Sequence, residues 1–215
     1  MEKILQDFSV LTYDQRLARL GLKKEWLLKV SETLALIPNE ITSDDIAGAL
    51  GLKAYIQAVR TLREVLKPYG WQPYRDRQLE LVISPKKDFY IAVSSGDQFT
   101  GIKNIAPKTR YPKGPQTLQR VDVNKQLNLF PELKKEKEKN VPLPTWYFLY
   151  FIDLKGKEVR SELSYPLDTD EQGRISSWKT RIILPSIKIE SEVKIDLEAV
   201  EAEGVEEIIL GEQDI

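Results

Sequence analysis

The residues best suited to catalysis are carboxylates and a lysine near one apolar segment. Asp153 and Lys155 have the D-x-K spacing, in which the carboxylate helps to hold Mg²⁺ and the lysine positions or activates water. Asp97 or Asp88 would have to supply the second carboxylate. This is the chemistry of a metal-dependent restriction- or repair-type nuclease, with Mg²⁺ as its only cofactor. Because a glycine follows Lys155, an ordinary exposed hairpin turn is the preferred interpretation, and no cofactor or metal is expected.

The chain has neither cysteine nor histidine. Their absence excludes disulfides, thiolate catalysis, Ser-His-Asp triads and zinc sites built from these residues. No GxxxxGK[ST] phosphate loop is present, which argues against a nucleotide triphosphatase. Any enzymatic activity would therefore have to use carboxylates, lysine, tyrosine, serine or threonine. A non-enzymatic protein is the leading interpretation, and the metal-dependent nuclease is the alternative.

A second set of residues is suited to contacting DNA. Arginine and glutamine can bind guanine and adenine edges, and lysine and arginine can bind phosphates. Three segments supply such side chains: a helical segment, a turn after it, and a loop rich in glycine and proline. The candidate DNA-binding residues are Lys53, Gln57, Arg60, Thr61, Lys67, Arg75, Arg77, Lys103, Lys108, Arg110 and Lys113.

The helical segment must position the first of these groups. Ser43 suits a helix N-cap, and Gly51 suits a chain reversal, which predicts one helix over 43–50 and a second over 54–67. Ile46, Leu50 and Leu62 belong to the expected shared core of the two helices. Alternating apolar residues over 79–83 then predict a β-hairpin over 71–83 with Arg75 and Arg77 at its tip.

Residues 42–84 resemble the helix-turn-helix and winged-helix superfamily. The resemblance rests on Ile46-Ala47 followed by Leu50-Gly51-Leu52, with a small residue where the two helices touch. It implies that Gln57, Arg60 and Thr61 face a DNA groove, with the hairpin as the wing. The alternative is a plain helical hairpin used for packing or for protein contacts.

Charge is distributed unevenly along the chain. The net charge is +1 for residues 1–70, +6 for residues 71–141 and −8 for residues 142–215. A basic middle and an acidic end suggest an anionic partner for the middle, with the loop from Lys103 to Lys113 contacting phosphates. The alternatives are a solvated loop and neutralisation by the acidic C-terminal third.

These patterns predict an α+β protein. We expect a helical, winged-helix-like domain over 1–84, a strand and a basic linker segment over 85–140, and an antiparallel β domain with an acidic tail over 141–215. DNA is the expected partner, with a protein partner or a homodimer through the β domain as a further option. No apolar run suits a membrane span, and the composition is typical of a microbial cytoplasmic protein. A third interpretation is an interaction module of a larger cellular or phage assembly.

Overall fold

A single mixed sheet of seven strands organises the protein. The computed structural model describes residues 12–130 and 142–190. The strand order is β1-β2-β3-β4-β5-β6, and β7 pairs with β5; β3 and β4 are parallel, and all other pairs are antiparallel. The strands are β1 (Gln72–Asp76), β2 (Leu79–Ile83), β3 (Tyr90–Ser95), β4 (Thr145–Asp153), β5 (Glu158–Thr169), β6 (Ile175–Ile183) and β7 (Ile187–Lys188).

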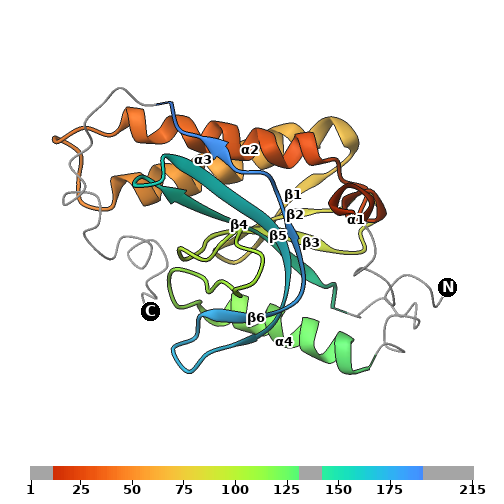
Figure 1. Ribbon diagram of the computed structural model, residues 1–215. Coiled ribbons are helices and arrows are strands. Elements are labelled where there is room, and N and C mark those ends of the chain that lie inside the picture. The colour runs from red at the N-terminus through yellow and green to blue at the C-terminus, as the bar shows by residue number, and fades with distance from the viewer. Residues whose placement is uncertain (1–11, 131–141, 191–215) are drawn as a thin grey trace.

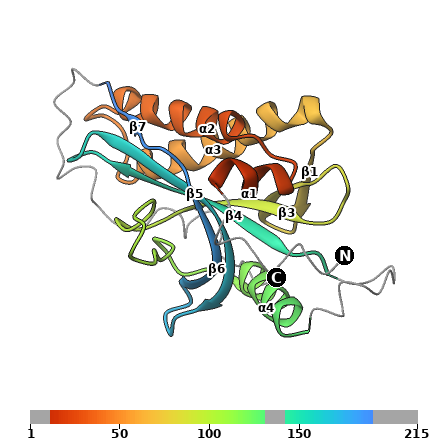
Figure 2. The ribbon, with the colours of Figure 1, turned by 45° about the vertical axis from the view of Figure 1, so that its right-hand side comes forward.

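Helices cover both faces of the sheet, so the protein is α+β as predicted. They are α1 (Tyr13–Arg19), α2 (Lys24–Leu36), α3 (Ala49–Leu66) and α4 (Pro115–Leu129), with 3-10 turns over Ile37–Glu40 and Lys67–Tyr69. Figures 1 and 2 show α2 and α3 side by side over one face and α4 beneath the other. No helix among the described residues is long and apolar enough to cross a membrane.

The central strands are buried on both sides, which explains their continuous apolar sequence. All six residues of β3 are buried. In β4, Trp146 and Phe148 pack toward α2 and α3, whereas Tyr147 and Leu149 pack on the opposite face in the cluster that contains Val121 of α4. Both faces of this aromatic strand are therefore covered, and neither is free to serve as a dimer surface.

The predicted pair of helices around Gly51 is wrong, because residues 49–66 form one helix. A glycine inside a helix costs only about 1 kcal/mol relative to alanine, which the surrounding alanines and leucines outweigh. The chain reverses earlier, at Gly48, which has a φ of 79°. A turn precedes it, closed by a hydrogen bond from the Thr42 amide to the Asp45 carboxylate (2.9 Å). Ile46, expected in the core, is 68% exposed.

The predicted β-hairpin is confirmed as β1 and β2, but it is not a separate wing. β2 pairs with β3, so the hairpin forms one edge of the same sheet that contains β4, β5 and β6. The core on the α2 and α3 face likewise combines Leu62 and Val82 with Phe148 and Leu163. The expected boundary at residue 84 therefore falls inside one sheet and one core.

The segment between β3 and β4 contains more regular structure than we expected. The helix α4 begins at Pro115, a residue whose fixed φ suits the first turn of a helix. It crosses the sheet and allows β3 and β4 to run parallel. The loop from Gly96 to Gly114 lies on the same face as α4 (Figure 2).

Candidate functional site

An open groove of about 490 Å³ lies between α3 and the β1–β2 hairpin. We call it the α3–hairpin groove. Its apolar lining consists of Tyr55, Ile56, Val59 and Pro73, and its charged lining consists of Arg60, Arg63, Glu64, Lys67 and Glu80. Alanines and leucines on the inner side of α3 hold the helix against the sheet and leave these residues at its outer edge. The groove thus joins two segments that the sequence predicted to contact DNA.

Glu80 is the central carboxylate of the groove. Arg63 and Arg75 each donate to it at 2.5 Å, one from α3 and one from β1. Burial raises the pKa of the Glu80 carboxyl, but the hydrogen bonds from both arginines more than offset this, so the pKa lies below its usual value. Its contribution to stability is present above pH 4.5 and is lost as the pH falls through the lowered folded-state pKa.

Two further cations of the groove, Arg60 and Lys67, form no ion pair with any described residue, and neither does Arg77 of the hairpin. Arg60 is exposed on α3, and Lys67 is exposed directly after the last residue of α3, about 10 Å farther along the helix axis. Arg77 occupies the tip of the hairpin with a φ of 54°. That left-handed conformation costs an arginine about 1 kcal/mol. Arg60, Arg63, Lys67 and Arg75 are four cations against the carboxylates of Glu64 and Glu80, so the groove is positively charged.

Two of the three side chains that the resemblance placed in a DNA groove, Gln57 and Thr61, make local contacts instead, whereas the third, Arg60, is exposed. Thr61 is only 5% exposed, and Gln57 donates to its hydroxyl at 3.2 Å. Lys53 donates to the Glu40 carbonyl at 2.9 Å and lies 3.8 Å from a carboxylate oxygen of Asp45. These three side chains make contacts within the protein. α3 packs along the sheet, so only the residues on its outer edge face solvent.

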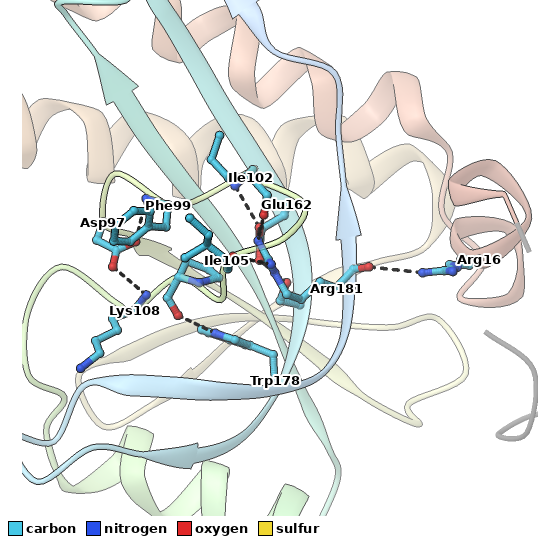
Figure 3. A network of polar contacts seen from close by, with 12 residues as sticks. Arg16, Asp97, Phe99, Ile102, Ile105, Lys108, Glu162, Trp178 and Arg181 are labelled. Carbon is cyan, nitrogen blue, oxygen red and sulfur yellow. Dashed lines mark hydrogen bonds and ion pairs between the residues drawn. The ribbon is translucent and has the colours of Figure 1, made fainter. Parts of the chain in front are cut away.

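The basic loop lies on the opposite face of the sheet from the α3–hairpin groove. Arg181 of β6 holds it there by donating to the carbonyls of Ile105 (2.7 Å) and Ile102 (3.0 Å), as Figure 3 shows. The Arg181 guanidinium is in turn bound to Glu162 of β5, which is fully buried and also accepts the Gly101 amide at 3.0 Å. The candidate DNA-binding residues of this loop therefore do not form one surface with those of α3 and the hairpin.

The four loop cations differ in their surroundings. Lys108 pairs with Asp170 at 2.9 Å, and the backbone amide of Lys113 donates to the Gly173 carbonyl. Arg110 lies 5.7 Å from the ring centre of Tyr111, and Lys103 is exposed without an ion pair to any described residue. The expectation of neutralisation by the C-terminal third is thus met at Lys108.

The residues considered for metal-dependent catalysis are occupied by local contacts. Asp97 accepts the backbone amides of Phe99 and Lys108, each at 3.0 Å. Asp153 accepts the Gly156 amide at 2.8 Å and an Arg160 nitrogen at 3.2 Å. Lys155 is exposed in the β4–β5 turn. In the described parts of the chain, no group of three or more carboxylates could hold a metal ion. Nothing in this geometry favours nuclease chemistry.

Comparison of the chain with protein-family models, with curated proteins and with solved structures gave no match.

The sequence did not indicate three residues that shape these two regions. Arg63 and Glu80 form an ion pair in the groove. The sequence places one in a helix and the other in a strand, but it does not indicate that they are in contact. The role of Glu162 was not apparent because its partner, Arg181, is 19 positions away. A charged residue within an otherwise buried strand was the only available signal, and it does not identify the partner.

Proposed function

We propose that this chain is a non-enzymatic DNA-binding protein that contacts phosphates through the α3–hairpin groove. The observation that carries the proposal is that Arg60 and Lys67, which form no ion pair with any described residue, line one groove beside the β1–β2 hairpin. Phosphate contacts by lysine and arginine supply sequence-independent affinity. Because Thr61 is buried and Gln57 is held by it, base recognition by these two side chains is not part of the proposal.

The charge of the described residues supports the same proposal. Residues 12–130 carry 19 basic and 12 acidic side chains, and residues 142–190 carry seven of each. The described residues therefore have a net charge of +7, although the whole chain has −1. A surplus of this sign favours association with a polyanion.

Removing two groove cations should weaken DNA binding. We expect Arg60→Gln/Lys67→Gln to lower the affinity for a random 20-base-pair duplex about tenfold at low salt, and to reduce the slope of log K against log salt by about 2. Fluorescence anisotropy over a salt series would measure both quantities. The matched control is Lys103→Gln/Arg110→Gln, which removes the same charge from the opposite face. Equal loss in the two variants, or no binding by the unaltered chain, would overturn the proposal.

Glu80→Gln should have the opposite effect on binding. The substitution removes the carboxylate that Arg63 and Arg75 share, so both guanidinium groups become available to phosphates. We expect DNA affinity to rise about threefold or more while stability to urea falls. A variant that only disturbed folding would lose both DNA affinity and stability. A drop in affinity would therefore contradict the role given to the groove.

A further inference from the structure

The acidic charge of this chain is concentrated in one segment. Residues 191–215 lie outside the described residues, and their sequence contains nine acidic side chains and one lysine, a net charge of −8. Residues 142–190 are neutral, so this segment accounts for the whole negative charge of the C-terminal third. It nearly equals, with opposite sign, the charge of +7 on the described residues.

We infer that the acidic segment 191–215 occupies the α3–hairpin groove of its own chain and competes there with DNA. The competition with DNA rests on the proposed function, whereas the docking of the segment in the groove does not. Opposite charges at close range attract most strongly where several cations lack a counter-ion, as Arg60, Lys67 and Arg77 do within the described residues.

The described chain ends close enough for this contact. The carbonyl of Glu190 accepts the side-chain amide of Asn39 at 3.1 Å. The next residue, Glu40, accepts Lys53 of α3 at 2.9 Å, and Arg60 lies two helical turns beyond Lys53. This path is roughly 25 Å long, whereas 25 extended residues span roughly 80 Å.

The chemistry of the segment also fits the groove. In its sequence, Val193, Ile195 and Leu197 alternate with Lys194, Asp196 and Glu198, so the segment supplies apolar as well as mostly acidic side chains. The groove has an apolar lining that includes Ile56 (47% exposed), and cations lie along its edge. Ile46, 68% exposed before α3, adds apolar surface near the helix N-terminus. An acidic amphipathic segment can cover both kinds of surface.

Carbodiimide coupling of the full chain would test the docking without nucleic acid. The reagent joins a carboxylate to a lysine amine that touches it, with loss of water. We expect mass spectrometry to find Lys67 joined to a glutamate of the segment, whereas Lys103 on the opposite face serves as the matched control. The Lys108–Asp170 pair, at 2.9 Å, is the internal positive control.

Three coupling results would overturn the inference: no segment product when Lys108–Asp170 forms, a segment product at Lys103 but not at Lys67, or Lys67 joined to Glu2 or Asp7. A Lys67 product that joins light and heavy chains in an isotope mixture would also overturn it, because the occupant would then be a second copy. The yield of the Lys67 product should fall at 0.5 M salt, because at about this ionic strength charges are screened over a few ångströms.

Competition is tested in a full-length variant with Glu201→Gln, Glu203→Gln, Glu206→Gln and Glu207→Gln. We expect it to bind the random duplex about tenfold more tightly than the unaltered chain at low salt, because a tethered competitor is weakened. Unchanged affinity would overturn the competition. If neither chain binds DNA, the proposed function fails, and the coupling at Lys67 still decides whether the segment docks.

Discussion

Replacing Glu162 with alanine is expected to lower the free energy of unfolding by about 3–5 kcal/mol. The carboxylate is fully buried, and Arg181 donates to it at 2.5 and 2.9 Å. Without it, the Arg181 guanidinium, 14% exposed, keeps its charge but loses its counter-ion. Urea denaturation would measure the change in stability. Hydrogen exchange of the Gly101 amide, which also donates to Glu162, would report release of the loop.

The matched control is Glu158→Ala on the same strand. Glu158 pairs with Arg160 at 3.6 Å and is partly exposed, so its removal should cost less than about 1 kcal/mol. Glu162→Gln retains the acceptor oxygen and should fall between the two. If Glu162→Ala were as mild as Glu158→Ala, the buried pair could not be what holds the loop on the sheet.

The second large effect is expected at Asn124 of α4. Its side chain accepts the Thr145 amide (2.8 Å) and donates to the carbonyls of Thr145 (2.7 Å) and Pro166 (3.2 Å). Asn124→Leu would leave these buried backbone groups without their partner, at a cost of about 2–4 kcal/mol. Because Pro166 lies where the β5–β6 register shifts, one side chain satisfies the irregular part of the sheet.

Urea denaturation again measures the effect, and Lys125→Ala on the same helix is the control. Lys125 pairs with Asp168 at 2.7 Å on the surface, so its loss should change stability by less than about 1 kcal/mol. Asn124→Asp would add a charge facing two carbonyls, so its destabilisation should be larger at pH 7 than at pH 4, where more of the carboxyl is protonated. A destabilisation from Asn124→Leu no greater than that from Lys125→Ala would show that α4 is held mainly by its apolar contacts.

Sequence patterns predicted several elements closely because the signals are local. The alternating residues of β2 follow one another directly, and the glycine-containing turn between β4 and β5 is also a signal of a few adjacent residues. The prediction of two helices around Gly51 was wrong because it also relied on a local signal. A local glycine suggested a reversal, whereas packing of Ala54, Ala58 and Leu62 against the sheet supports one continuous helix.

The candidate site was predicted only in part. The cations Arg60, Lys67 and Arg77 were identified by residue type, but Arg63 and Glu80 were not, because their pairing is a contact between a helix and a strand. Local sequence also could not assign the basic loop to a face of the sheet. That face is determined by Glu162 and Arg181, which lie 61 to 79 positions after the loop residues that they bind.

By itself, the sequence determined the α+β class, the β-hairpin over 71–83, the lack of cysteine and histidine chemistry, and the separation of a basic middle from an acidic end. These properties follow from composition and from periods of two or 3.6 residues. Only the tertiary structure decided that β1 and β2 join the same sheet as β6, and that α3 and the basic loop lie on opposite faces. Strand order and the choice of face depend on contacts between distant residues, which no local pattern specifies.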